Sequence, residues 1–162
     1  SNNYVPSTFP GLKSGDQATS FAQTARYTGS MLELVAATTS TELGKSYRST
    51  WFTTNGTMWA NLSSELIEAT LPHAMSSFAV DGIYYRLETN ATGLDLYYSS
   101  DRKSWTKSSK VALRGLDTEA MKGANFIAWA QDSYIYILRG ANTAGASAPS
   151  LLKGEILKSK TQ

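Results

Sequence analysis

The chain has 162 residues, enough for one domain with a buried core. Its formal net charge of +2 is too small to indicate nucleic-acid binding, and the lack of cysteine excludes disulfides, thiolate metal sites and a cysteine nucleophile. Hydrophobic residues make up 41% of the chain and charged residues only 17%, without any apolar run as long as a membrane span.

Apolar and polar residues alternate over most of the chain, the pattern of half-buried β-strands. In chain order we expect strands at 31–37, 47–53, 83–87, 94–99, 134–139 and 151–157, with short apolar segments at 21–22, 78–79 and 126–128. Helical signals are weak, and they predict a turn or two at 63–69 and at 118–124. The sequence therefore predicts an all-β protein.

One short pattern occurs twice, at residues 53–59 and at residues 99–105. Each copy reads hydroxyl residue, any residue, Asn or Asp, three residues, Trp. Asn55 and Asp101 lie 46 residues apart, and so do Trp59 and Trp105. A repeat of that length is the size of one four-stranded propeller blade.

The residue types of this pattern suit a tight hairpin turn. The Asn or Asp accepts hydrogen bonds from backbone N–H groups, as in Asx turns, while the hydroxyl bonds to the same turn and the Trp covers its apolar side. These positions hold Thr53, Asn55, Gly56 and Trp59 in the first copy, and Ser99, Asp101 and Trp105 in the second. Asn-Gly is itself a hairpin signal because both residues tolerate positive φ. The second copy has Arg102 in place of Gly56, so it must use a different turn or accept strain.

The repeated pattern resembles the Asp-box, also called the BNR repeat, which lies on the hairpin between the third and fourth strands of a β-propeller blade. The usual Asp-box has Gly two residues after the Asp and Trp five residues after it. Both copies here are a shorter variant, and the first has Asn55 in place of Asp. The chain also resembles the propeller region of secreted proteins from Bacteroides-type gut bacteria. These resemblances imply a bacterial protein that is secreted, periplasmic or on the cell surface.

The predicted strands form three repeat units, at approximately residues 21–62, 78–110 and 126–158. We therefore expect a single unit over residues 1–162, a β-propeller-like array of about three four-stranded antiparallel blades. Because a propeller ring closes with four to eight blades, three do not suffice. Three explanations stay open: the chain is part of a larger propeller, a second copy completes the ring, or the sheets form a compact fold of another kind.

Two classes of function fit this sequence. The first is a non-catalytic extracellular module that binds a glycan or a protein partner through exposed aromatic and cationic side chains. The candidate ligand-binding residues are Tyr84, Tyr85, Arg86, Trp129 and Arg139. The alternative, implied by the resemblance, is a fragment of a sialidase-like glycosidase propeller. Such an enzyme needs an arginine cluster, a Tyr–Glu nucleophile pair and an Asp acid/base.

No catalytic or metal-binding residue can be assigned from the sequence. The Arg-Ile-Pro signature of sialidases is absent, and the one histidine, His73, has no second His or Cys with which to form a metal site. A glycine-rich phosphate loop is also absent. We therefore expect no cofactor, no metal and no nucleic-acid partner.

Overall fold

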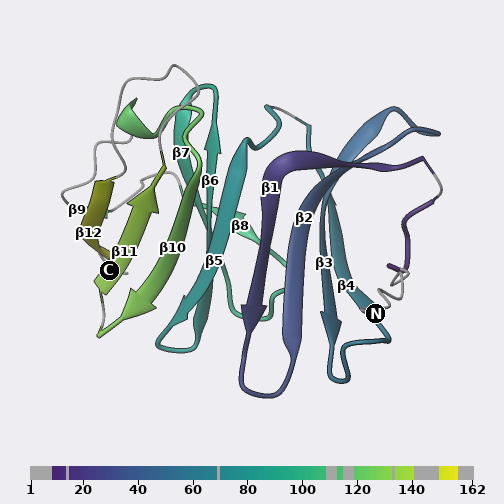
Figure 1. Cartoon of the computed structure of the whole chain (residues 1–162), viewed down its shortest axis with the longest axis horizontal. Helices are drawn as coiled ribbons and strands as arrows, with labels where there is room; N and C mark the ends of the chain where they lie inside the picture. The colour runs from purple at the N-terminus through teal and green to yellow at the C-terminus, as the bar shows by residue number, and fades with distance from the viewer. Residues whose placement is uncertain are drawn as a thin grey trace, which may run out of the picture.

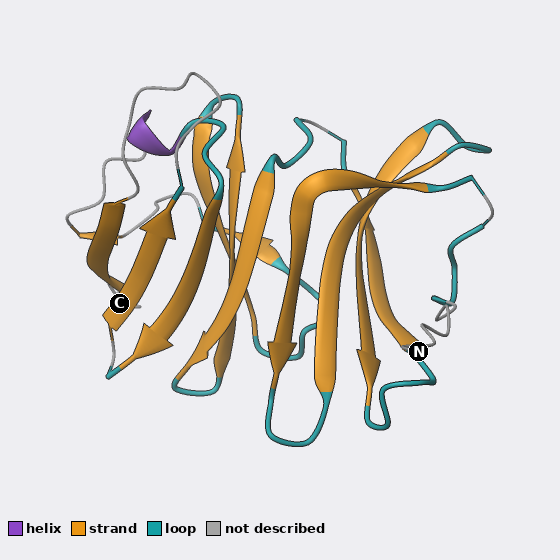
Figure 2. Ribbon diagram, viewed as in Figure 1, coloured by secondary structure: helices purple, strands orange, loops and turns teal. Residues whose placement is uncertain are grey.

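The fold consists of three four-stranded antiparallel sheets placed side by side like blades (Figures 1 and 2). The computed structural model describes residues 9–13, 15–68, 70–108, 113–114, 119–132, 134–140 and 150–156. The predicted all-β array of about three four-stranded antiparallel blades is confirmed. The inner strands β1, β5 and β10 lie next to one another, and the other strands of each sheet extend away from them (Figure 1).

The first two sheets follow the order of the chain. The first contains β1 (Gln17–Tyr27), β2 (Leu32–Ser40), β3 (Lys45–Thr53) and β4 (Ala60–Leu66). The second contains β5 (Ala74–Val80), β6 (Ile83–Asn90), β7 (Gly93–Ser99) and β8 (Thr106–Lys107). The Asp81-Gly82 dipeptide joins β5 to β6 with positive φ at both residues, as a tight hairpin turn requires.

The third sheet takes one strand from an earlier part of the chain. Its order is β10 (Phe126–Gln131), β11 (Tyr134–Arg139), β12 (Ser150–Ile156) and then β9 (Leu113–Arg114), which precedes β10 in sequence. Leu113 pairs with Ile156, and Arg114 pairs with Glu155. The third sheet therefore differs from the expected repeat at 126–158, because its fourth strand comes from before that repeat. Residues 109–110, 133, 141–149 and 157–158 of the expected repeats lie outside the described residues.

The two contacts between sheets are built differently. Between the second and third sheets, a large apolar core contains the buried side chains of Phe78, Leu87, Leu96, Met121, Phe126, Ile135 and Ile137. Between the first and second sheets, the apolar cluster contains only Val35, Ala37, Ile67 and Met75. The contact between the first and second sheets therefore relies on polar side chains in addition to this small apolar cluster.

Phe9 and Pro10, which precede β1, cover part of the outer face of the first sheet. The Phe9 ring packs on Trp51 with ring centroids 5.4 Å apart, and on Trp59 with centroids 4.9 Å apart. The indole N–H of Trp51 donates a 2.9 Å hydrogen bond to the carbonyl oxygen of Pro10. Trp51 is buried as a result, although it faces away from the second sheet.

One helical expectation is wrong and one is partly right. Residues 63–66 belong to β4, because the open edge of β3 offers backbone partners such as Arg48, which pairs with Glu65. Pairing with a formed strand outweighs the weak helical propensity of that segment. Within the described part of this segment, 119–124, there is one 3-10 turn, η1, at Glu119–Met121.

Replacing Leu87 with Ala tests the apolar core between the second and third sheets. The Leu87 side chain is 0% exposed, so we expect Leu87→Ala to lower the free energy of unfolding by about 2–5 kcal/mol. The matched control is Leu151→Ala, since Leu151 is 61% exposed and should change stability by no more than about 0.5 kcal/mol. Urea denaturation measures both, and equal effects would contradict the assigned core.

Candidate functional site

The first repeated turn, residues 53–59, connects β3 to β4 and is held together by two side chains. The Asn55 Oδ1 atom accepts hydrogen bonds from the backbone N–H groups of Thr57 and Met58, each at 3.0 Å. The Thr53 Oγ1 atom accepts from the N–H of Gly56 at 3.0 Å and donates to Asn55 Oδ1 at 3.1 Å. Gly56 has φ of 77°, a left-handed conformation that glycine adopts without strain.

The second repeated turn, residues 99–105, connects β7 to β8 with equivalent bonds. The Asp101 Oδ1 atom accepts from the N–H groups of Lys103 and Ser104 at 2.8 Å each, and the Ser99 Oγ atom accepts from the Arg102 N–H at 2.8 Å. Arg102 has φ of 63°, so this turn has the same conformation as the first but places a non-glycine residue in the left-handed region. Bonds from Ser104 and then Lys103 lower the pKa of Asp101 below its ordinary value of 3.8.

The Arg102 side chain connects this turn to the first sheet. Its Nη1 atom lies 3.1 Å from Oε2 of the buried Glu33 on β2, and its guanidinium stacks 4.9 Å from the Tyr84 ring centroid. Arg26 of β1 also pairs with Glu33, at 3.6 Å, and stacks on Tyr84 at 5.2 Å. Tyr84 and Glu33 are thus each in contact with two arginines at the boundary between the sheets.

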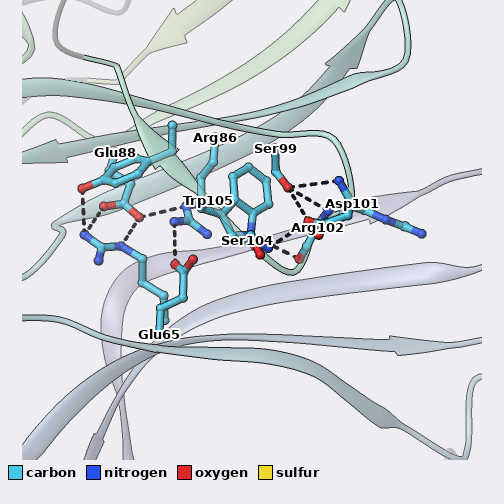
Figure 3. A network of polar contacts seen from close by, with 10 residues as sticks. Glu65, Arg86, Glu88, Ser99, Asp101, Arg102, Ser104 and Trp105 are labelled. Atoms are coloured by element: carbon cyan, nitrogen blue, oxygen red, sulfur yellow. Dashed lines mark hydrogen bonds and ion pairs between the residues drawn. The ribbon is translucent and has the colours of Figure 1, made fainter.

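A second group of charges is buried deeper between the first and second sheets (Figure 3). Glu88, only 1% exposed, accepts two hydrogen bonds from Arg48, including 2.6 Å from Nη2 to Oε2. Arg86, also 1% exposed, donates from Nη2 to Oε2 of Glu65 at 3.1 Å. The Nε of Arg86 lies 3.1 Å from Glu88 Oε1, but its N–H is not aligned for a hydrogen bond, so that contact is electrostatic.

Two aromatic rings complete this buried group of charges. The Arg86 guanidinium stacks 4.4 Å from the Trp105 ring centroid and 4.9 Å from that of Tyr97. The Tyr97 hydroxyl accepts a 3.2 Å hydrogen bond from Arg48 Nη2. Burial, reinforced by the negative charge of Glu88, raises the pKa of Tyr97. For Arg48, burial alone would lower the pKa, but the bonds and charge of Glu88 outweigh it and raise the pKa.

An open groove of about 670 Å³ lies across the inner strands, and we call it the inner-strand groove. Its lining residues come from β1, β5, β10, β11 and the adjoining positions: Thr24, Ala25, Ala74, Met75, Asn125, Phe126, Ile127, Leu138, Arg139 and Gly140. Ala74 and Phe126 begin β5 and β10, at the end of the sheets opposite the two repeated turns (Figure 1). The groove is mostly apolar, with Arg139 as its one charged residue among those lining residues.

Buried hydrogen bonds fix the strands that form the inner-strand groove. The Ser76 hydroxyl on β5 donates to the Ala128 carbonyl of β10 at 3.0 Å and accepts from the Ala128 N–H at 2.8 Å. The Thr89 hydroxyl donates to the Ala124 carbonyl at 2.7 Å, just before β10 begins. The Gly140 N–H donates to the Asn125 carbonyl at 2.8 Å. These bonds fix the positions of β5, β10 and β11 relative to one another.

The structure does not bring the five candidate ligand-binding residues together. Arg86 is buried among the ion pairs, Tyr84 lies between two arginines, and Tyr85 stacks on Phe78 with ring centroids 5.7 Å apart. Trp129 is 38% exposed on the open face of the third sheet, where it stacks on Tyr136 with centroids 5.6 Å apart. Arg139 alone of the five lines the inner-strand groove.

Sequence reasoning missed two kinds of residue. Glu88 and Glu65 gave no signal, because a glutamate in an alternating strand reads as solvent-exposed and its arginine partner lies on another strand. Asn125 and Met75 of the inner-strand groove come from segments 50 residues apart, so no local pattern connects them. Glu88 stands in a run of five buried residues, Arg86–Asn90, but only the structure shows that burial, so no sequence signal could have found this glutamate.

Comparisons with models of known protein families and with curated protein sequences found no match to this chain. Within the described part of the chain, no helix has the length and apolar character that crossing a membrane requires. The described residues also contain no group of three or more His, Cys, Asp or Glu side chains placed to hold a metal ion. The site must therefore be interpreted from its own geometry.

The pH dependence of stability tests the role of Asp101. Its pKa is lower in the folded chain than in the unfolded chain, so its ionised form stabilises the fold above the unfolded pKa, and this contribution is lost as pH falls through the folded pKa. We expect the Asp101→Asn protein to keep the turn, because Asn55 forms the same bonds in the first copy. Between pH 5 and pH 2 its stability should fall less than that of the native chain, and the difference is the contribution of the Asp101 carboxylate. Thermal unfolding at several pH values measures this, and identical pH profiles would contradict it.

Neutralising Glu88 tests the buried charges between the first two sheets. Glu88→Gln leaves Arg48 and Arg86 without their shared carboxylate, so we expect a loss of about 3–5 kcal/mol in the free energy of unfolding. The matched control is Glu42→Gln, because Glu42 pairs with Lys13 at the exposed surface and should contribute about 0–1 kcal/mol. A Glu88→Gln protein as stable as the control would show that the ion pairs do not hold the sheets together.

Proposed function

We propose that this protein is a non-catalytic binding module whose ligand occupies the inner-strand groove. The observation that carries the proposal is the groove itself, an open, mostly apolar concavity of about 670 Å³ whose lining includes the polar residues Thr24, Asn125 and Arg139. Small-molecule sites in proteins have volumes of roughly 300–1,000 Å³ and the same mixture of apolar walls and few polar groups. The hydrogen bonds of Ser76 and Thr89 hold the second and third sheets together on one side of this groove.

The sialidase-like alternative has its best support in the group of Arg48, Arg86, Glu88 and Tyr97. The group supplies the arginines and the Tyr–Glu pair that such a reaction needs, since Tyr97 lies beside a glutamate and two arginines, but it does not include the Asp acid/base. Their position argues against catalysis, because Arg86 and Glu88 are each 1% exposed and leave a sugar no access. This group is best explained as a contact between sheets, and the binding module is therefore the favoured function.

The proposed module is extracellular, and a glycan or a protein is its expected partner. The resemblance of the two repeated turns to the Asp-box supports the extracellular location. Trp129 supports glycan binding, because an exposed indole ring stacks well on the apolar face of a sugar. Trp129 follows Ile127 of the groove by two positions on β10, so both side chains lie on the same face of the third sheet.

Methyl NMR tests the inner-strand groove directly. We expect a screen of small-molecule fragments to shift the methyl signals of Ile127 and Leu138, because both residues line the groove and are exposed. The control signals are those of Met58 and Leu66, which belong to the exposed surface of the first sheet. Fragments that shift only the control methyls, or none, would contradict the assigned site.

A glycan array tests the carbohydrate partner. If the exposed Trp129 ring stacks on a sugar, Trp129→Ala should weaken every sugar signal by about tenfold or more, which is the effect of about 1.4 kcal/mol. Trp105→Ala is the matched control: its indole lies over Arg86 between the sheets, so its loss should lower stability but leave binding per folded molecule unchanged. An array without signals would favour a protein partner, and hydrolysis of a fluorogenic glycoside would restore the enzyme alternative.

A further inference from the structure

The outer face of the third sheet carries exposed apolar side chains. Among the described strands, this sheet is the last of the row, and its other face packs on the second sheet (Figure 1). Ile127, Leu138 and Leu151 pair across three strands and are 58%, 40% and 61% exposed. Trp129 and Tyr136, which stack on each other, lie beside this row. We call these five residues the third-sheet face.

The second sheet contains the equivalent of the third-sheet face. β5 and β6, like β10 and β11, form a hairpin with a two-residue loop whose first residue is an Asp with φ of 51°. Counting from the two loops gives the equivalent residues of the two hairpins. They are Phe78 and Trp129, Tyr85 and Tyr136, and Leu87 and Leu138. Leu96, which pairs with Leu87, corresponds to Leu151, which pairs with Leu138.

The two equivalent faces share their geometry but differ in their surroundings. The aromatic pair of the second sheet has its ring centroids 5.7 Å apart, and that of the third sheet has them 5.6 Å apart. In the second sheet, Leu87 and Leu96 are buried because the third sheet packs on them. The third-sheet face therefore repeats a surface that, one sheet earlier, is the contact with a neighbouring β-sheet.

We propose that the third-sheet face binds a second copy of this chain, with the two third sheets packed face to face across a two-fold axis. Ile127, Leu138 and Leu151 of each copy then lie against the same face of the other, as the inner faces of a β-sandwich do. The aromatic pair suits this role, since Trp and Tyr are enriched in the cores of protein interfaces. Large exposed apolar patches commonly mark such interfaces.

The first sheet of a second copy is a poorer partner for this face. Its outer face is already occupied by Phe9, which packs on Trp51 and Trp59 and leaves Trp51 buried. A head-to-tail ring, with the third sheet of one copy on the first sheet of the next, requires Phe9 to be displaced. A two-fold dimer displaces none of these side chains, and it is the commonest symmetry of protein oligomers.

The size of the third-sheet face predicts a weak dimer. β10 and β11 have six residues each and β12 has seven. With strands about 4.8 Å apart and a rise of about 3.3 Å per residue, the face measures about 14 Å by about 20 Å. Each copy therefore buries less than the roughly 800 Å² that a standard interface takes from each partner. We expect a dissociation constant in the micromolar range or above.

This inference goes beyond the proposed function and does not depend on it. The two are connected because Ile127 and Leu138 belong both to the third-sheet face and to the lining of the inner-strand groove. A ligand that covers these side chains and a second copy therefore exclude each other. Fragments that bind the groove should shift the equilibrium toward the monomer.

Sedimentation equilibrium from low micromolar to millimolar concentrations of the whole chain tests the dimer. We expect a reversible monomer–dimer equilibrium that Leu151→Glu weakens at least about tenfold, because it places an unpaired charge in an apolar contact. The matched control is Leu43→Glu: Leu43 is 60% exposed, lies between β2 and β3, and should leave the equilibrium unchanged. If Leu151→Glu does not fold, Ile127→Glu replaces it.

Isotope-filtered NOE spectra of mixed labelled and unlabelled chains identify the contact. We expect intermolecular NOEs that connect the methyl groups of Ile127, Leu138 and Leu151 with the third-sheet face of the other copy. NOEs to Tyr27 and Leu32, which lie on the outer face of the first sheet, would instead show a head-to-tail contact and overturn the inference.

Two further results would overturn the inference: a monomer at every concentration, or a dimer that Leu151→Glu weakens no more than Leu43→Glu does. These outcomes are separate from the test of the proposed function. A dimer whose groove methyls respond to no fragment, even at concentrations where the chain is monomeric, would reject the proposed function and keep this inference. A monomer whose groove binds fragments would do the reverse.

Discussion

Glu88 lies between two guanidinium groups inside the contact of the first and second sheets, and the relative position of these sheets depends on that arrangement. The apolar cluster at this contact is small, so the contact contributes little apolar burial. The buried charges must therefore pair with one another to offset the free-energy cost of their desolvation. The second and third sheets meet instead through a continuous apolar core. Ion pairs specify geometry more narrowly than apolar packing does, since each bond needs a particular distance and direction. The contact between the first and second sheets therefore constrains the angle and distance between them more than the contact between the second and third sheets does.

The fold could be predicted because its signals are local. Alternating residues in segments such as Tyr134–Arg139 indicate strands, and the spacing of Asn55 and Asp101 indicates repeated units. The source of the fourth strand in the third sheet could not be predicted, because Leu113 pairs with Ile156 across more than 40 residues. The helical prediction at 63–69 was wrong for a related reason. Residues 63–66 pair with the free edge of β3, and the local sequence does not show that such a pairing partner is present.

The candidate site was less accessible to sequence reasoning than the fold. Arg139 was named as a candidate for its residue type, and only the structure shows that it lines the inner-strand groove and that no described carboxylate pairs with it. Arg86 was named by the same reasoning and lies buried between sheets. Arg86 lies within β6 and Arg139 ends β11, and both follow alternating aromatic and branched residues, so their local sequences do not separate them. What separates them is the neighbouring sheet, which supplies Glu65 to Arg86.

The left-handed Arg102 shows how local and long-range preferences oppose each other in this chain. Judged by its turn alone, the position favours glycine, and a consensus-based stabilisation of the repeat would place glycine there, as at Gly56. That choice would relieve the backbone but remove the guanidinium from Glu33 and Tyr84 on the other side of the boundary. Engineering of such repeats should therefore evaluate each turn together with the neighbouring sheet that its side chains contact. A residue that strains the backbone of its own turn can be the one that holds two sheets together.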